Sequence, residues 1–429
     1  MQAFKALWKY GRFFLFPALS LLALVLMLAG AGQALIALAV FTFAFIFIGD
    51  ALFGKDEGSY EYRQAWVFYP IQYAAQIVCI LTVLMFAWML GAYVAGNDLF
   101  GFAAGLERLT GYDLLAAHAG DTLGVILAAF AVAAIAATNA SIIVGHELTH
   151  RTENPVAVFM GRLGEAFGMF TLFSIRHPYG HHNLVCTPAD PATSLRGETY
   201  YHFVIRSTIG QYKQVWDLEK ERLTRMGRSP FGIGNRALRG WAMEAVVAGI
   251  FVLAAGGWGL LAYLAIGFFA RNALELANYI EHHGLVRVPT EPMQVRHAWN
   301  CNYRMSNWFL CAINRHSHHH ADASVEFWDL KPLVGEAPHT PGGYTTAFLY
   351  ALVPPLWYRR ISPLLLQWDR EMATEAERRL AAEQNVKSGV SQLENETYGY
   401  DREELLRGSQ PGPRGWDNLI PPAPRPQFA

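Results

Sequence analysis

Long uncharged stretches alternate with polar segments in the first third of the chain, and they predict membrane-spanning helices. Residues 13–49, 64–97 and 122–145 contain no Lys, Arg, Asp or Glu, whereas one span needs only about 20 apolar residues. A Gly-Ala-Gly-Gln sequence inside the first stretch predicts a turn, so we interpret that stretch as a hairpin of two helices. The other two stretches predict one span each, which gives about four helices in residues 1–145.

A fourth apolar stretch, residues 245–270, is interrupted by Gly256 and Gly257. We interpret it as a second hairpin, with charged ends such as Glu244 and Arg271 near the membrane surface. The pattern therefore predicts an all-α integral membrane protein with about six transmembrane helices and a cytoplasmic helical cap. The chain then divides into N-terminal transmembrane helices (1–145), a cytoplasmic segment (146–239), a transmembrane hairpin (240–280), a second cytoplasmic segment (281–383) and a polar, loose C-terminal tail (384–429).

The distribution of basic residues predicts that both termini lie in the cytoplasm. With six spans, residues 1–12 and 146–239 lie on one side of the membrane and residues 99–120 on the other. The first two segments carry three and twelve Lys or Arg residues, and the third carries one. Because the more basic side faces the cytoplasm, we expect a multi-pass protein of the inner (cytoplasmic) membrane. Residues 156–175 are apolar but contain two charges, so we expect them to be interfacial or packed rather than spanning.

The composition agrees with a membrane protein and argues against several other classes. The chain has 429 residues, of which 53% are hydrophobic and 16% charged, against about 25% charged in soluble domains. The net charge of −1 provides no field that would favour nucleic acid. The four cysteines form no CxxC pair, so the sequence indicates neither a disulfide framework nor a thiolate metal site. The first apolar stretch is too long for the core of a signal peptide.

Histidine is concentrated in four short segments. His146 and His150 are four residues apart and so share one helix face, and the second and fourth segments repeat this chelating spacing. Imidazole suits iron, zinc, copper and nickel, and there are too many ligands for one tetrahedral zinc. We therefore expect two metal ions. Eleven of the 15 histidines lie in residues 146–150, 177–182, 282–283 and 316–320.

The predicted topology places all four histidine segments on the same face of the membrane. The first segment begins where the span at 122–145 ends, and the third directly follows the last span. The other two belong to the cytoplasmic segments. A metal site at this level, just above an apolar bundle, can meet a substrate that arrives through the lipid.

The four segments resemble, in order, the motifs of the integral-membrane alkane 1-monooxygenase family and its xylene monooxygenase relatives. That family is marked by HExxH, HxxxHH, NYxEHxGL and RHSxHHA, which stand here as HELTH, HPYGHH, NYIEHHGL and RHSHHHA. The resemblance covers residues 140–370 and is limited to hydropathy in the first spans. It extends to the intervening sequences TPADPATSLRGE, HAWNCNYRMSNW and GGYTTAFLYALVPPLWYRR.

The resemblance implies a non-haem diiron site with O2 as co-substrate. Iron rather than zinc follows from the resemblance, since the ligand type alone does not choose between them. Glu147, Asp190 and Glu281 are candidates for carboxylates that orient ligating imidazoles by accepting their other N–H, although surface or capping roles would also explain them. The nine histidines carried over as ligands are His146, His150, His177, His181, His182, His282, His316, His319 and His320.

Three positions depart from the family pattern. Arg176 precedes the second motif, where the family often has Glu; His318 stands where Asp is usual; and Arg151 follows the first motif, where alkane hydroxylases tend to have Lys. These differences do not affect the metal ligands, but they leave the identity of the substrate undetermined. We expect His283 and His318 to be the spare members of their clusters, the ones that are not needed as metal ligands. The histidines expected to be unrelated to metal are His118, His202, His297 and His339.

The resemblance implies hydroxylation of a terminal or benzylic methyl group of an alkane or alkylbenzene, giving a primary alcohol. The reaction needs two electrons from outside. The sequence has no GxGxxG between a strand and a helix and no paired CxxC, so we expect no flavin, nicotinamide or haem on this chain and no fused rubredoxin. A separate rubredoxin- or ferredoxin-type carrier, with its reductase, would then dock on the cytoplasmic face. Basic residues of segment 146–239 are candidate contacts, although their role as positive-inside charges explains them slightly better.

Three other functions share some of these features. A membrane fatty-acid desaturase or acyl hydroxylase has similar histidine motifs and differs in its product. A membrane zinc metallopeptidase would use Glu147 of HELTH as general base and would need no reductant. A metal transporter should place its ligands in mid-membrane, whereas these histidines lie at the ends of spans.

Overall fold

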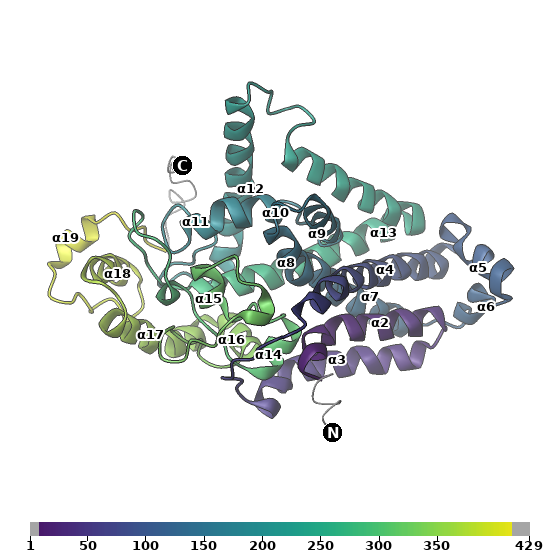
Figure 1. The fold of residues 1–429 in the computed structure, drawn as a ribbon, viewed down its shortest axis with the longest axis horizontal. Helices are drawn as coiled ribbons and strands as arrows, with labels where there is room; N and C mark the ends of the chain where they lie inside the picture. The colour runs from purple at the N-terminus through teal and green to yellow at the C-terminus, as the bar shows by residue number, and fades with distance from the viewer. Residues whose placement is uncertain (1–7, 414–429) are drawn as a thin grey trace.

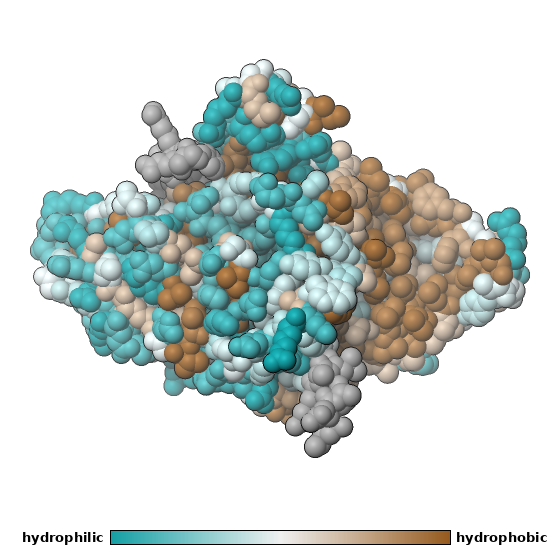
Figure 2. Space-filling view, in the orientation of Figure 1, coloured by the Kyte–Doolittle hydropathy of each residue, from teal (hydrophilic) through white to brown (hydrophobic). Residues whose placement is uncertain are grey.

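The computed structural model describes residues 8–413, and these residues form helices and loops without a β-strand. Five helices are long and apolar enough to cross a membrane, and they pack side by side at one end of the molecule (Figure 1). Figure 2 shows that this end carries the most hydrophobic surface. The prediction of an all-α membrane protein is therefore confirmed. The helices are α2 (Leu15–Leu28), α3 (Gly32–Phe53), α4 (Phe68–Ala95), α7 (Leu123–Thr138) with its continuation to His150, and α13 (Arg236–His282).

Small residues allow the helices of this bundle to approach one another closely. Ala129, Ala133 and Ala136 of α7 are fully buried. A Cβ added to Gly91 of α4 would lie 2.6 Å from the carbonyl oxygen of Ala254 in α13. Lipid provides no hydrophobic force between helices, so close packing of small residues is what associates them.

Helix α13 is broken near its middle. The backbone leaves helical geometry at Ala255 (φ −137°) and Gly256 (φ 58°), and glycine tolerates a positive φ that other residues rarely adopt. A Cβ on Gly259 would lie 1.8 Å from the carbonyl oxygen of Phe251, so the chain doubles back here, and the two halves of α13 diverge from this point in Figure 1. The break falls within the glycine-interrupted stretch from which the hairpin was predicted. The structure has five candidate spans with α13 taken as one, and the count of six remains a prediction.

The polar segments fold into a helical cap at the other end of the molecule. Helix α9, predicted to be interfacial or packed, is capped by the Asn154 side chain and packs against α4, α8 and α13. The cap helices are α8 (Val144–His150), α9 (Pro155–Phe167), α10 (Phe173–Arg176), α11 (His182–Leu184), α12 (Tyr200–Arg225), α14 (Arg304–Phe309), α15 (His316–Ala321), α16 (Tyr344–Ala351), α17 (Pro354–Glu371), α18 (Glu375–Lys387) and α19 (Arg402–Arg407). Two short helices, α5 (Phe102–Thr110) and α6 (Leu114–His118), lie at the end of the bundle remote from the cap (Figure 1).

The prediction of a loose tail from residue 384 is wrong for residues 384–413. Val390 and Leu393 belong to the main apolar cluster of the cap, and Leu405 of α19 packs on α18. The Asn385 side chain accepts a hydrogen bond from the buried Arg196 guanidinium. The segment looked loose because it is polar in composition, but its few apolar side chains find partners far away in the sequence. Residues 414–429 of the predicted tail lie outside the described residues.

Candidate metal centre

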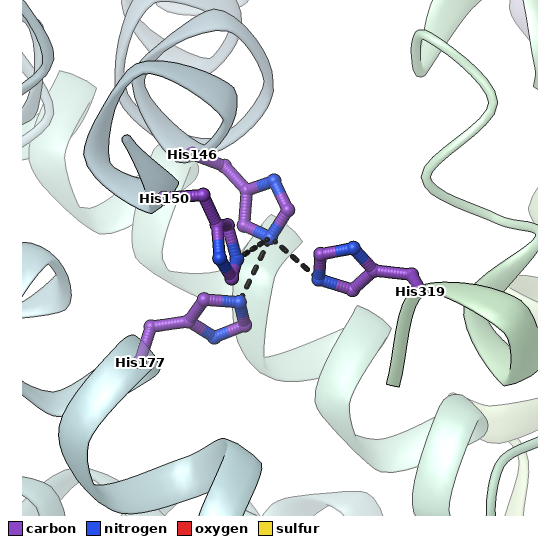
Figure 3. Close-up of side chains that lie close together, drawn as sticks. All are labelled: His146, His150, His177 and His319. Atoms are coloured by element: carbon purple, nitrogen blue, oxygen red, sulfur yellow. Dashed lines mark hydrogen bonds between the residues drawn. The ribbon is translucent and has the colours of Figure 1, made fainter. Parts of the chain in front are cut away.

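Eight of the nine predicted histidine ligands fall into two groups where the cap meets the bundle. In each group, one ring nitrogen from each histidine lies within 4.8 Å of those from the other three, so each group can hold a metal ion. Figure 3 shows the first group converging from three separate elements. The first group is His146, His150, His177 and His319, and the second is His181, His282, His316 and His320.

Local backbone geometry brings these rings together. His146 and His150 lie one turn apart on α8, which continues the membrane helix α7 through a π-helical turn, Asn139–Ile143. A second π-helical turn, His177–His181, carries two ligands and runs into α11 with His182. Single π-turns inside α-helices occur mostly at functional sites, because the extra residue re-aims the side chains that follow.

The closest nitrogen distances fit donors around a shared ion. His146 Nε2 lies 2.8 Å from His177 Nε2 and 3.1 Å from both His150 Nε2 and His319 Nε2. Two nitrogens bound at about 2.0–2.1 Å to one metal are separated by about 3 Å. The observed separations therefore match metal ligands as well as hydrogen-bonded rings.

The second group and the ninth histidine follow the same arrangement. His316 Nε2 lies 3.0 Å from His282 Nε2. His182 lies between the groups: its Nε2 is 3.0 Å from His177 Nε2, and its ring stacks on that of His320 with centroids 4.4 Å apart. The structure thus brings all nine predicted ligands into one continuous cluster of imidazoles.

The three predicted carboxylates contact histidines in two different ways. Glu147 Oε1 lies 3.3 Å from His146 Nδ1, on the side of the ring away from the cluster. Asp190 Oδ2 accepts from His181 Nδ1 at 2.9 Å. The Asp190 position suits a carboxylate that orients a ligand through its other nitrogen, whereas His146 Nδ1 has no hydrogen-bond partner among the described residues.

Glu281 is placed differently from the other two carboxylates. Its Oε2 lies 3.3 Å from Nε2 of His316, which is the nitrogen that faces His282. The Tyr344 hydroxyl donates to Glu281 Oε1 at 2.6 Å and holds the side chain in this position. Glu281 therefore reaches toward the place where a metal would sit. The sequence alone did not distinguish this orientation from that of Glu147.

The spare histidines lie outside both groups. His283 is buried beside Ser194 and Trp357, and the Nδ1 of His318 accepts from the backbone of Lys331. Each of the four histidines expected to be unrelated to metal has its own partner elsewhere. These contacts are His118 with Asp121, His202 with Glu198, His297 with Glu377, and His339 with the backbone oxygen of Asn300.

The electrostatic environment keeps the imidazoles neutral. Burial, and then the neighbouring imidazoles, hold the pKa of His177, His182 and His319 well below the usual value for histidine. Neutral imidazole is the form that binds a metal. Both ring nitrogens of His320 and Nε2 of His181 are buried without a hydrogen-bond partner among the described residues. Buried polar atoms of this kind are rare in proteins, and metal coordination would satisfy them, so the donor set fits two metal ions.

An apolar cavity of about 390 Å³ leads to this cluster from the bundle. At its inner end are His146, His177, His316 and Glu281. Its walls come from α3, α7, α13, α14 and α16 and are mostly Phe, Ile and Leu. Phe268, which also lines it, is 72% exposed on the hydrophobic surface of α13. The cavity therefore joins the lipid-facing side of the bundle to the histidines.

Two residues at the site were not identified from the sequence. Tyr344 lines the cavity and anchors Glu281. Arg176 was noted only as a departure from the family motif, yet it is fully buried and hydrogen-bonded to Asp190 at 2.5 Å. Tyr344 lies in the GGYTTAF sequence that formed part of the resemblance, and this was the only signal that could have pointed to it.

The fold and the site define a class: a helical membrane protein with a buried polyhistidine centre able to hold two metal ions. Comparison with known proteins agrees. A family model described as fatty acid desaturase matches residues 121–350. Because this match covers more than half of the 429 residues, the chain belongs to the fatty acid desaturase family, and within it to the alkane 1-monooxygenases and their relatives.

Individual relatives support this placement. The chain is 32% identical over 283 residues to alkane 1-monooxygenase 2 of Alcanivorax borkumensis, covering 65% of this chain and 69% of the relative. It is 36% identical over 247 residues to the xylene/toluene monooxygenase hydroxylase component of Pseudomonas putida, covering 57% and 66%. It is 35% identical over 237 residues to alkane 1-monooxygenase of Acinetobacter baylyi, covering 54% and 57%. The chain thus spans somewhat more than half the length of this last relative.

Proposed function

We propose that this chain is a diiron monooxygenase that hydroxylates a terminal or benzylic methyl group of a hydrophobic hydrocarbon. The observation that carries the proposal is the apolar cavity that ends at the two histidine groups. A peptidase or a transporter has no need for such a cavity at a cluster of nine imidazoles. The names of the relatives, alkane 1-monooxygenases and a xylene/toluene monooxygenase component, support the same reaction class.

The cavity provides binding without directional polar contacts. Its aromatic walls, including Phe173, Phe309 and Phe348, suit an alkyl chain or an alkylbenzene. We propose that the substrate enters from the lipid between α3, α13 and α16, where Phe47, Phe268 and Leu349 are exposed. The reacting methyl group would then lie at the inner end, near His146 and His316. Apolar packing along the chain keeps water out and leaves one end of the substrate facing the histidines.

The nine histidines would hold two iron ions, which supply O2 activation and electron transfer when bound. Written as a balance, the reaction joins RH, O2, two electrons and two protons to give ROH and H2O. Glu147 and Asp190 would orient their histidine ligands. Tyr344 would keep the Glu281 carboxylate beside His316, at the inner end of the cavity.

The two electrons would come from a separate rubredoxin- or ferredoxin-type carrier with its reductase. We propose that this carrier docks on the cap, which would face the cytoplasm of a multi-pass inner-membrane protein with both termini inside. His150 and His182 are only partly buried, so the cap surface near them is the shortest way to the cluster.

A desaturase or acyl hydroxylase is the second candidate, because the matching family model is described as fatty acid desaturase. It would use the same metal centre, and the polar headgroup of its acyl substrate would lie at the outer end of the cavity. Product analysis separates the two reactions, because an alkene within an acyl chain indicates a desaturase and a primary alcohol indicates a hydroxylase.

The deciding experiment measures metal content and product together. Purified protein in lipid nanodiscs is given n-octane and p-xylene in competition, with O2 and a reductase–rubredoxin system. About two irons per chain and an O2-dependent primary alcohol are expected, and the preferred substrate separates the alkane from the xylene type. One zinc, no iron and no O2-dependent product would contradict the proposal and favour a metallopeptidase.

A further inference from the structure

We propose that Arg176 is a positioning residue for the metal ligand His181 and acts through Asp190. This inference rests on the proposed metal centre and on no particular substrate. Arg176 would fix which ring nitrogen of His181 faces the metal, and its charge would raise the reduction potential of that metal.

The contacts of Arg176 join it to the second histidine group. Its side chain is completely buried, and so is that of Asp190. Arg176 Nη2 donates to Asp190 Oδ1 at 2.5 Å, while His181 Nδ1 donates to Asp190 Oδ2 at 2.9 Å. The two oxygens of one carboxylate therefore connect the guanidinium to the imidazole, and Arg176 Nη2 also lies 3.4 Å from His181 Nδ1.

This arrangement selects one tautomer of His181. Asp190 receives hydrogen bonds from Arg176, Thr193 and the backbone of Ala192, so its carboxylate serves His181 as an acceptor. His181 must then carry its proton on Nδ1. Its Nε2 keeps a free lone pair, is buried without a hydrogen-bond partner among the described residues, and belongs to the group with His282, His316 and His320.

Arg176 provides more than a hydrogen bond, because two neutral groups already donate hydrogen bonds to Asp190. Thr193 Oγ1 donates to Asp190 Oδ2 at 2.8 Å, and the Ala192 backbone N–H donates to Oδ1 at 3.2 Å. What Arg176 adds is a permanent positive charge in a site of low dielectric. That charge draws electron density from Asp190 and makes His181 a weaker electron donor to a metal.

A second buried carboxyl group lies within electrostatic range of Arg176. Glu275 of α13 is fully buried and interacts electrostatically with Arg176. Its Oε1 accepts from Gln211 at 2.7 Å. Arg176, Asp190 and Glu275 are therefore all buried, and none of the three lines the cavity.

The test compares R176M with R176K and with a matched control, R196M. Arg196 is an equally buried arginine that pairs with Asp369 at 2.6 Å, but it makes no contact with a histidine ligand. Each variant is reconstituted in nanodiscs. Three properties are measured without substrate or O2: the Fe2+ dissociation constant by anaerobic titration, the midpoint potential by spectroelectrochemistry, and the thermal unfolding temperature.

We expect R176M to bind Fe2+ about tenfold more weakly, as is typical when a group that orients a ligand is lost. Its midpoint potential should shift to a more negative value, because the variant lacks the positive charge that lies beside Asp190 and His181. R176K should recover most of both properties. R196M should unfold at a lower temperature and, while folded, should keep the affinity and potential of the wild type.

Two outcomes would overturn the proposal: an unchanged potential and affinity in R176M, or an equal change in R196M. If R176M does not fold, R176Q, whose neutral side chain can still donate a hydrogen bond to Asp190, takes its place and is expected to show the same negative shift. A wild-type protein that binds no Fe2+ would overturn both this inference and the proposed function. A protein that binds Fe2+ with these shifts but oxidises no hydrocarbon would overturn only the proposed function.

Discussion

The membrane bundle and the cap bury very different side chains. The core of the bundle consists mainly of Ala, Leu, Met, Val, Ile and Phe residues from α2, α3, α4, α7 and α13. The cap also buries charges, and it pairs them: Arg196 with Asp369, Arg206 with Glu198, and His297 with Glu377. In the bundle, close fit of small residues provides the stability. In the cap, removing one partner of a pair leaves a buried charge that nothing compensates.

The metal centre lies where these two regions meet, and it takes a different contribution from each. Of the proposed ligands, His282 ends the bundle helix α13, and His146 follows α7 through the π-helical turn and the start of α8. The cap supplies the remaining ligands and the groups that hold them, such as Asp190. Rigidity and access are therefore separated: the cap positions most of the imidazoles, while the bundle provides most of the apolar cavity through which we propose that the substrate enters.

The largest effect is expected where the two regions share the site. H316A removes a ligand of the second group and breaks the contact with both His282 and Glu281. Activity should fall at least about 100-fold, beyond the usual loss for a group that only orients a ligand, and iron content should drop by about half. Iron analysis and product formation on the same sample check this. Full activity with two irons would remove His316 from the ligand set.

A strong destabilisation of the cap alone is expected for D369A. Asp369 accepts from Nη1 and Nη2 of Arg196 at 2.7 and 2.6 Å, and from the Tyr398 hydroxyl at 2.6 Å. Leaving Arg196 buried and unpaired should cost about 3–5 kcal/mol. Limited proteolysis should then cut the cap and spare the bundle. Equal loss of protection in both regions would show that they unfold as one unit.

A smaller destabilisation, this time in the bundle, is expected for G91V. The new side chain would meet the backbone of Ala254, which lies 2.6 Å from the added Cβ. Overpacking of this kind costs about 1–3 kcal/mol. Thermal unfolding should shift downward while Fe2+ affinity of the folded protein stays the same. An unchanged unfolding temperature would mean that α4 and α13 can move apart freely.

The smallest effect is expected in acid, at the pair of His297 and Glu377. Burial opposes ionisation of Glu377, but His297 and Arg296 lower its pKa from an ordinary 4.5 to about 2. A carboxylate with a lowered pKa stabilises the fold above its ordinary pKa, and this stability is lost as the pH falls toward the lowered value. E377Q should therefore be less stable than wild type at neutral pH, and the difference should shrink between about pH 4.5 and 2. A difference in stability between E377Q and wild type that stays constant across that pH range would exclude the His297–Glu377 pair as the cause of the difference.

Much of the bundle and of the ligand set was predictable because both depend on residues near one another in the sequence. Uncharged stretches of sufficient length must satisfy their backbone hydrogen bonds as helices in lipid. Spacings of three and four residues place histidines such as His146 and His150 on one helix face. The positions of these elements follow from local rules, and the structure agrees with them.

The sequence by itself thus determined the membrane helices, the fold class and the histidines available to bind metal. Only the tertiary structure decided which histidines share a group, why Glu281 faces inward, that residues 384–413 are packed, and that Arg176 lies behind Asp190. The physical reason is that these features depend on side chains that meet across long sequence separations. Such contacts depend on the packing of the whole cap, and no local periodicity encodes them.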